Sequence, residues 1–392
     1  MTMSCKDGRQ QRLAALHGDH RRNDQGLWGV TVFLDLWIFI MKKRLFTQLS
    51  TLLLACTALP GAALAQAPTP GGMEELAHYA GPDRMQRLVE GAKKEGSLVW
   101  YNAFTSENVK QLIEPFEKKY GIKVNVWRAR AELTLQRFIY EARADKPVAD
   151  IITSSAAEVL HRENLLQEIV SPYQKELIPS AVPAHREWAA VLQFVLVQAY
   201  NTNKVNKDEL PKTYQDLLAP KWKGKLGIEG TDHVWVTSVI NDMGEANGTR
   251  FFDDLTAGNK LSVRLGHPLM TNLVASGEVP LALTVYQYSV EEAKKSGAPI
   301  DWFVIDSAVA TFGAMAIPKK APHPHAAILF YDYMISAEGQ SIIAKIGYPT
   351  TNLKVKSPIG NVKLKFLDPG SLIDGEEKSN TRFESILRNN KN

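Results

Sequence analysis

Two tyrosines, Tyr286 and Tyr288, directly follow a predicted strand, Val279 to Val285, and are separated by Gln287. Alternate residues of an extended segment face the same side, so we expect the two phenol rings to point the same way. A phenolate oxygen is a hard donor that suits a hard cation such as Fe(III). If the bound species is ferric iron, Tyr288 and Tyr286 are therefore the predicted metal ligands. Half-buried tyrosines without a ligand role are the competing interpretation.

Hydroxyl side chains mark three predicted strand-to-helix junctions: Thr105 with Ser106, Ser154 with Ser155, and Thr231 before Asp232. In a doubly wound sheet, the carboxyl ends of the strands face the ligand crevice. Helices that begin there direct free N–H groups into it, which suits an anion. These residues are predicted to bind the ligand, although each could be an ordinary helix N-cap.

Two arginines, Arg128 and Arg130, follow the second predicted strand on either side of Ala129. A guanidinium at this edge could hold a carboxylate or a phosphate through two parallel hydrogen bonds. Pairing with Glu132 or with solvent is the alternative. His267 lies on a predicted loop, where a histidine is usually solvated.

No catalytic signature is present. The sequence lacks H-E-x-x-H, G-x-S-x-G, the Walker A motif and the dinucleotide glycine fingerprint. Both cysteines, Cys5 and Cys56, precede residue 66, so the remainder of the chain can form no disulfide and offers no thiolate to a metal. We therefore predict no catalytic residues, no cofactor and no enzymatic activity. A secreted enzyme of unknown chemistry is the weakest alternative.

The elements that must position these residues alternate regularly between strand and helix. Strands are predicted at 98–101, 123–127 and 149–153. Each is followed by a helix, and the first of these helices carries apolar residues at helical spacing from Val109 to Tyr120. This alternation predicts an α/β fold with parallel, doubly wound sheets.

Two long apolar segments could cross between lobes. One is the strand 191–200, and the other lies at about 303–317. Two crossings predict two doubly wound lobes: 66–200 forms the first part of lobe 1, 201–305 forms lobe 2, and 306–392 returns to lobe 1 with C-terminal helices. Residues 66–392 are enough to give each of the two lobes a hydrophobic core.

The N-terminus has the pattern of a secretory signal peptide at 41–65. Basic residues follow Met41, an apolar run ends at Leu59, and Ala63-Leu64-Ala65 offers a cleavage site. We expect export to the periplasm, with lipid attachment at Cys56 as the less favoured route. Residues 1–40 are best explained as an over-extended leader.

The charge balance of the body excludes a partner class. The chain has 46 Lys+Arg and 42 Asp+Glu, and this basic excess lies entirely within residues 1–65. The body is then neutral, which argues against nucleic-acid binding. The full chain has 45% hydrophobic and 22% charged residues, which is typical of a globular protein.

The body also resembles a known family, the periplasmic solute-binding proteins of ABC transporters, in their ferric-iron-type branch with the type II binding-protein fold. The resemblance is carried in order by Gly96–Tyr101, Phe116–Val124, Ala149–Ile152, Tyr200–Val205, Tyr214–Leu218, Pro220–Lys225, Gly277–Val279, Ala282–Leu283 and Ser336–Gln340. It spans about residues 96–350.

The resemblance implies two lobes that close on a ligand and delivery of the ligand to a membrane permease. We also expect a monomer. Ferric binders of this branch place a His or Tyr after the first strand, an acidic residue or Tyr after the third, and two adjacent tyrosines late in lobe 2. Here hydroxyl residues occupy the first two places, and Gln287 splits the tyrosines. Two ligands stay open: ferric iron or an iron complex as the transported species, and a small organic anion such as a phosphonate, sugar phosphate or carboxylate.

Overall fold

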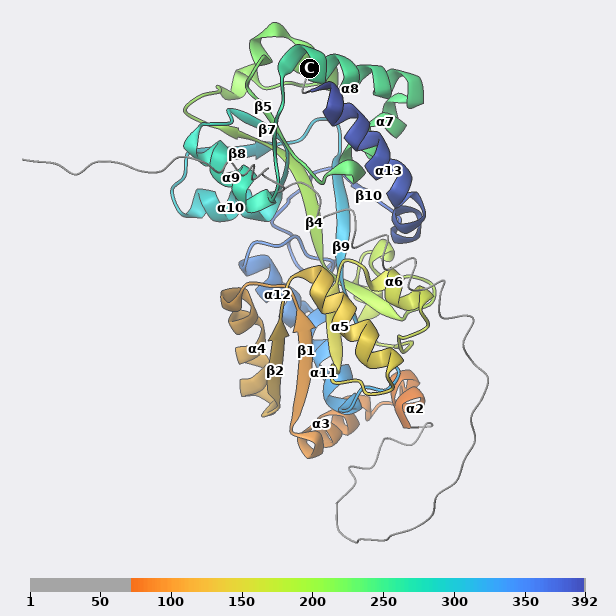
Figure 1. Ribbon diagram of the computed structural model, residues 1–392. Helices are drawn as coiled ribbons and strands as arrows, with labels where there is room; N and C mark the ends of the chain where they lie inside the picture. The colour runs from red at the N-terminus through yellow and green to blue at the C-terminus, as the bar shows by residue number, and fades with distance from the viewer. Residues whose placement is uncertain (1–71, 391–392) are drawn as a thin grey trace, which may run out of the picture. The chain divides into compact units, whose positions relative to one another are not determined.

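The computed structural model describes residues 72–390, all within one structural unit that runs from Ala65 to Asn392. The predicted leader and signal peptide lie outside the described residues. The described strands form one mixed sheet in the order β2-β1-β3-β9-β4-β7-β5-β6, with β10 paired to β9 and β8 paired to β4 (Figure 1). Within 72–390, every helix is too short or too polar to cross a membrane.

The strands are β1 (Ser97–Asn102), β2 (Lys123–Arg128), β3 (Ile151–Ser154), β4 (Trp188–Asn201), β5 (Leu226–Glu229), β6 (Ser262–Arg264), β7 (Leu281–Tyr286), β8 (Ile300–Phe303), β9 (Ala308–Ala316) and β10 (Leu364–Phe366). The helices are α2 (Gly72–His78), α3 (Arg84–Glu95), α4 (Ser106–Tyr120), α5 (Ala131–Arg143), α6 (Ala157–Arg162), α7 (His233–Met243), α8 (Glu245–Asn259), α9 (His267–Ser276), α10 (Gln287–Lys295), α11 (Pro324–Ile335), α12 (Ala337–Lys345) and α13 (Pro369–Asn389).

The first strand–helix–strand unit forms where the sequence predicts it. β1 pairs in parallel with both β2 and β3. The Thr105 side chain accepts a hydrogen bond from the Asn108 N–H and so caps α4. At the other end, Gly121 adopts φ 72°, a left-handed conformation that glycine reaches without steric cost and that ends the helix.

The two predicted crossover segments are β4 and β9, which lie side by side in the sheet (Figure 1). They pair with each other in the antiparallel sense from Trp188 opposite Ala316 to Leu196 opposite Val309. Each of them also pairs antiparallel with a neighbouring strand: β3 with β9, and β7 with β4. The sheet is therefore mixed, because parallel units on either side meet at two strands that run from one unit to the other.

The buried core changes along these two strands. Buried apolar residues from 73 to 192 and from 312 to 348 form one cluster, which we call core A. Buried residues from 195 to 310, together with three near the C-terminus, form two further clusters, which we call core B. Core A gives way to core B between Leu192 and Val195 on β4, and between Ala310 and Phe312 on β9. The change occurs earlier on β4 than the predicted crossing near residue 200; the lobe boundaries themselves stay a prediction.

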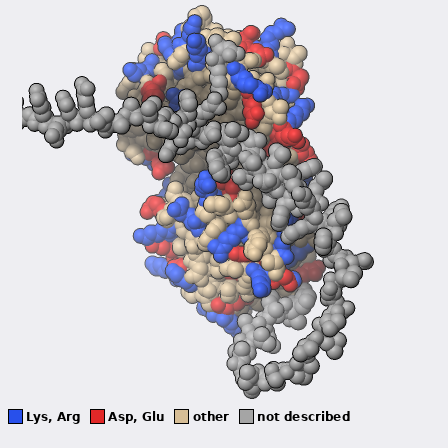
Figure 2. Space-filling model, in the orientation of Figure 1, with Lys and Arg blue, Asp and Glu red and all other residues tan. Residues whose placement is uncertain are grey.

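The C-terminal helix α13 belongs to core B through Phe383 and Ile386. Its first half reaches the other way: Arg162 of α6 donates to both carboxylate oxygens of Asp374, at 2.5 and 3.1 Å. Helix α13 therefore connects elements of both cores. On the face shown in Figure 2, acidic and basic side chains both occur over the described surface.

A buried carboxylate fixes the start of α11. Asp150 is fully buried, and its two oxygens accept hydrogen bonds from the Val99 N–H, the His323 N–H and the His323 Nδ1. The hydrogen bond to Asp150 outweighs the effect of burial and raises the pKa of His323. The protonated imidazole is thus the form that the folded chain favours.

We expect His323→Gln to destabilise the protein more at pH 5.5 than at pH 8.5. A folded-state pKa above the unfolded value stabilises the fold below the unfolded pKa of about 6.5, and this contribution disappears as the pH rises through the folded pKa. Because the ring is partly exposed, we expect a loss of about 1 kcal/mol at pH 5.5, below the usual range for a charged hydrogen bond. Urea unfolding at both pH values measures it, and equal losses at the two values would contradict the interpretation.

Candidate ligand-binding site

The two predicted tyrosines lie together. Tyr286 ends β7, and Tyr288 lies in the first turn of α10. Their rings stack with centroids 5.6 Å apart and planes at 15°. Tyr286 packs against core B, whereas Tyr288 packs against core A. The pair therefore lies where the two cores meet.

Burial is the main influence on both phenols. It raises the pKa of Tyr286, and the nearby Asp232, Tyr288 and Glu229 raise it further. Burial also raises the pKa of Tyr288, with hydrogen bonds to Ser289 and Tyr348 acting in the opposite direction. Both phenols are therefore neutral near pH 7, and a cation that binds them must displace their protons.

An aromatic cluster connects the tyrosine pair to the start of α4. The Tyr348 ring lies 4.4 Å from that of Tyr288 and 5.8 Å from that of Phe104, and Phe194 of β4 contacts Tyr286 at 5.6 Å, all measured between centroids. A hydrogen bond with Asn108, in the first turn of α4, lowers the pKa of Tyr348, although burial raises it overall.

Next to Tyr286 lies a group of two carboxylates and a histidine: Glu229, Asp232 and His267. The donor atoms of this group all lie within 4.8 Å of one another. The His267 ring packs on Tyr286 at 4.0 Å, and its Nε2 lies 3.3 Å from Asp232 Oδ1. Asp232 Oδ2 is buried and has no hydrogen-bond partner within residues 72–390. A hard cation bound here would find both phenol and carboxylate oxygens.

Of the two interpretations of Thr231, the helix N-cap is wrong, whereas ligand binding stays a prediction. Its N–H and its hydroxyl both donate to Glu229 Oε2, each at 2.6 Å, so the side chain is already engaged. Helix α7 has Asp232 at its N-cap position, without a side-chain cap hydrogen bond. Glu229 Oε1 accepts from the Gly266 N–H at 2.7 Å, so this carboxylate also holds the loop that places His267.

The predicted hydroxyl residues of the first lobe lie in two places. Thr105 caps α4, Ser106 begins that helix, and the aromatic cluster brings this turn near Tyr288. Ser154 is the last residue of β3, and its Oγ accepts from the Ala156 N–H rather than capping α6. Ser155 lines a cavity of about 230 Å³ between the start of α6, the start of α7 at His233, and α13.

Arg128 and Arg130 lie at the carboxyl end of β2, and both are exposed. Neither forms a salt bridge with any residue between 72 and 390. Of the two alternatives, pairing with Glu132 is not observed, whereas exposure to solvent is. Their position fits the predicted edge of the sheet, but no contact places them beside the tyrosine pair.

Tyr348, His267 and Asn102 lie near this site and were not among the residues predicted to form it. Tyr348 follows α12, far along the chain from its neighbours, and no local pattern marks it. His267 was expected to be solvated, whereas its side chain is only 14% exposed. Asn102 ends β1 fully buried, with its amide nitrogen unpartnered within the described residues. Its place at a strand's carboxyl end is the signal that could have identified it.

Comparison with known proteins identifies the family and the fold. A family model described as "Bacterial extracellular solute-binding protein" matches residues 146–368. Iron uptake protein A1 of Synechocystis sp. is 23% identical over 288 residues, covering 68% of this chain and 78% of that protein. The major ferric iron-binding protein of Neisseria meningitidis serogroup B is 25% identical over 266 residues, covering 63% and 78%.

Two solved structures show the same fold. Iron-bound HitA from Pseudomonas aeruginosa has a TM-score of 0.63 at 22% identity, covering 74% of this chain and 99% of that one. AfuA from Actinobacillus pleuropneumoniae, with fructose-6-phosphate bound, has a TM-score of 0.62 at 23% identity, covering 75% and 99%.

The resemblance and the fold class predicted from the sequence are thus confirmed: the chain has an α/β, type II periplasmic binding-protein fold. The matching family consists of binding proteins and not of enzymes, as the lack of catalytic signatures predicts. The match covers more than half of the sequence. The chain belongs to the bacterial extracellular solute-binding protein family.

Proposed function

We propose that this protein captures ferric iron, or an iron complex, between two lobes and delivers it to the permease of an ABC transporter. The observation that carries the proposal is the stacked pair Tyr286 and Tyr288, which lies where core A meets core B, beside Asp232 and His267. Phenol and carboxylate oxygens are the donors that a hard trivalent ion favours. Relatives named for iron uptake or ferric binding support the same ligand.

The proposed metal ligands, Tyr286 and Tyr288, belong to lobe 2 and lie between core A and core B. An ion bound to them could therefore affect both lobes. Tyr288 packs against core A and Tyr286 against core B, so an ion held by both is in reach of both cores. β4 and β9 are the covalent connections around which the lobes would close. Thr105, Ser106 and Asn102 are the proposed contributions of lobe 1, as donors to an anion that accompanies the ion.

We further propose that the protein acts as a periplasmic monomer, made with a signal peptide at 41–65 and released by cleavage after Ala65. The basic, apolar and Ala-x-Ala pattern supports this route.

A visible absorption band is the expected result of loading the purified body, residues 66–392, with ferric citrate. Tyrosinate bound to Fe(III) absorbs visible light, whereas the same protein with an organic anion does not. Titration at constant pH should reach saturation at one iron per chain. A colourless protein that retains no iron after desalting would contradict the proposal.

A small organic anion is the second candidate, and two observations favour it. Arg128 and Arg130 lie exposed and without a salt bridge at the carboxyl end of β2, and AfuA, a structural neighbour, binds fructose-6-phosphate. For such a ligand, Arg128→Ala or Arg130→Ala should lower affinity about ten- to a hundredfold, as expected for a lost charged hydrogen bond. Tyr288→Phe would then have the smaller effect. Ferric binding predicts the reverse order.

A further inference from the structure

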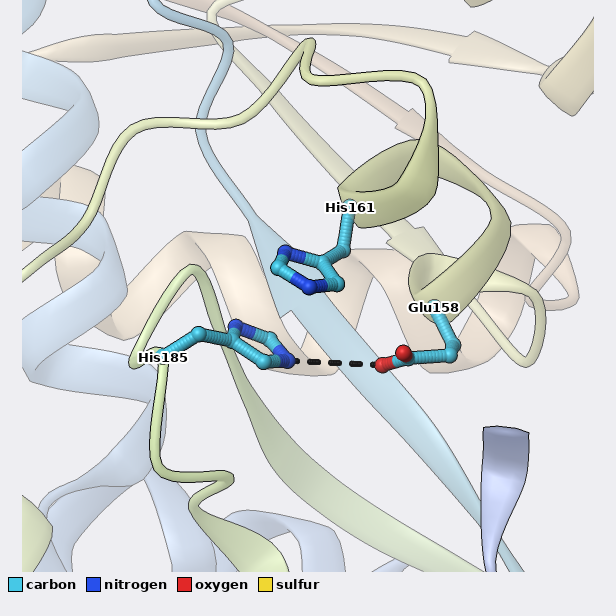
Figure 3. A group of neighbouring side chains, drawn as sticks. All are labelled: Glu158, His161 and His185. Carbon is cyan, nitrogen blue, oxygen red and sulfur yellow. Dashed lines mark hydrogen bonds and ion pairs between the residues drawn. The ribbon is translucent and has the colours of Figure 1, made fainter. Parts of the chain in front are cut away.

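A second group of metal-binding side chains lies outside the tyrosine site, on α6 and on the segment that leads into β4. Glu158 and His161 are three residues apart on α6, so they share one face of the helix. His185 approaches them from the other segment (Figure 3). One donor atom from each of the three residues lies within 4.8 Å of the other two.

The surrounding contacts orient two of these donors. His161 Nδ1 lies 2.9 Å from Glu187 Oε2, which leaves its Nε2 without a partner within residues 72–390. A carboxylate on the far nitrogen of a histidine is the usual outer-sphere support of a metal ligand. Trp188 Nε1 donates to Glu158 Oε2 at 3.2 Å and steadies that carboxylate.

The third donor, His185, faces Glu158. Its Nε2 lies 3.4 Å from Glu158 Oε2, a separation that the dashed line in Figure 3 marks. Its ring stacks on that of His161, with centroids 3.6 Å apart and planes at 7°. The Glu187 N–H donates to His185 Nδ1 at 3.1 Å, and metal binding through Nε2 would give up this contact because the proton moves to Nδ1.

From this geometry we infer that Glu158, His161 and His185 form a site for a divalent transition metal of the zinc class, separate from the ligand-binding site. Two imidazoles and one carboxylate are a donor set that zinc takes in proteins, with a fourth position open to water. A tetrahedral ion with bonds of about 2.0–2.2 Å needs donors roughly 3.3–3.6 Å apart, and the 3.4 Å between Glu158 Oε2 and His185 Nε2 already meets this. The stacked rings of His161 and His185 must tilt from their parallel arrangement before both Nε2 atoms can face one ion.

The partial exposure of the group fits an ion that enters from solvent. The side chains of Glu158, His161 and His185 are 16%, 30% and 22% exposed. Imidazole nitrogen prefers a borderline ion to hard Fe(III), so this site and the tyrosine site select different metals. Because Arg162 of the same helix holds Asp374 of α13, an ion here would brace α6 beside the C-terminal helix.

Zinc titration of the full body tests the assignment. The protein must carry no polyhistidine tag, and ZnCl₂ binding is measured by calorimetry, with Co²⁺ as a spectroscopic probe of coordination by nitrogen and oxygen. We expect one zinc per chain. His161→Ala and His185→Asn should each weaken binding by roughly a hundredfold or more, beyond the effect of losing an outer-sphere partner. His185→Asn keeps an acceptor for the Glu187 N–H, so it separates loss of a ligand from loss of local structure.

Two controls decide where the ion binds. His78→Ala removes a histidine that lies 3.4 Å from a single carboxylate, that of Glu168, and should leave zinc affinity unchanged. His267→Ala tests the other group of donors, beside Tyr286. The inference is overturned if His267→Ala abolishes zinc binding, or if the double variant H161A/H185A binds zinc as tightly as the parent. No detectable binding at 100 µM zinc would also overturn it.

Discussion

Replacing Tyr286 and Tyr288 together by phenylalanine is expected to abolish ferric binding while leaving the fold intact. Phenylalanine keeps the rings that stack at 5.6 Å and fill the junction of the two cores, but it supplies no oxygen to the ion. Each single change should lower iron affinity by more than the roughly 10- to 100-fold that loss of an outer-sphere partner costs. Loss of both ligands should leave no visible band.

The matched control for this prediction is Tyr214→Phe. Tyr214 is a half-buried tyrosine of the core B region that packs on Trp235 and Phe251 instead of on the tyrosine pair. Iron titration followed by absorbance, together with thermal melting of each apo-protein, separates lost ligation from lost stability. If the double variant binds iron within twofold of the parent, the ligands lie elsewhere.

Arg84→Ala is expected to have the largest effect on stability, a loss of about 3–5 kcal/mol in the free energy of unfolding. Arg84 of α3 pairs with Asp332 of α11, and their side chains are only 6% and 1% exposed. Burial raises the pKa of Asp332, against the influence of Arg84. Without the guanidinium, a carboxylate is left in the core with little to compensate its charge.

Two control variants test whether the loss of stability comes from the burial of the Arg84–Asp332 ion pair. The double variant R84M/D332L removes both charges and should recover most of the lost stability, because a well-packed apolar pair can replace a buried ion pair. Arg87→Ala breaks the exposed pair with Asp83, the residue that precedes α3, and should cost far less than Arg84→Ala. Urea unfolding at pH 7 measures all three. Equal losses for Arg84→Ala and Arg87→Ala would contradict the role of burial.

The sequence predicted those parts of the fold that depend on local pattern. The helix from Ser106 to Tyr120 follows from apolar spacing, a Thr105 cap and the terminating Gly121, all of which act within a few residues. The sequence did not predict that β4 and β9 run antiparallel to each other and to their neighbours β7 and β3. Both segments are apolar on both faces, and such a run states only that a strand is buried, not which neighbours it pairs with.

The candidate site was predictable to the same degree. Tyr286 and Tyr288 do lie together, but not for the predicted reason, because the extended segment ends at Tyr286 and Tyr288 is already in α10. Tyr348 could not be predicted, because its contact with Tyr288 depends on how α12 returns to the sheet. Glu229 was not predicted either. Its carboxylate accepts hydrogen bonds from both the N–H and the hydroxyl of Thr231, so the Thr231 side chain does not cap α7.

The discontinuity of core A has a consequence for the order in which the molecule folds. Core A needs residues 73–192 and also residues 312–348, so its last strand and helix emerge long after its first. Helix α11 is buried along ten consecutive residues, Ala326 to Ile335, and packs on the earliest helices. Until α11 is present, Trp100 and Phe116, both fully buried in the finished fold, lack the contacts that Phe330 of this helix makes with them.

Most of core B is contiguous in the chain, and closing loops within a contiguous segment costs less entropy. The chain is therefore expected to populate a folding intermediate in which core B is formed and core A is incomplete. The exposed apolar side chains of core A in this intermediate would be recognised by a holding chaperone.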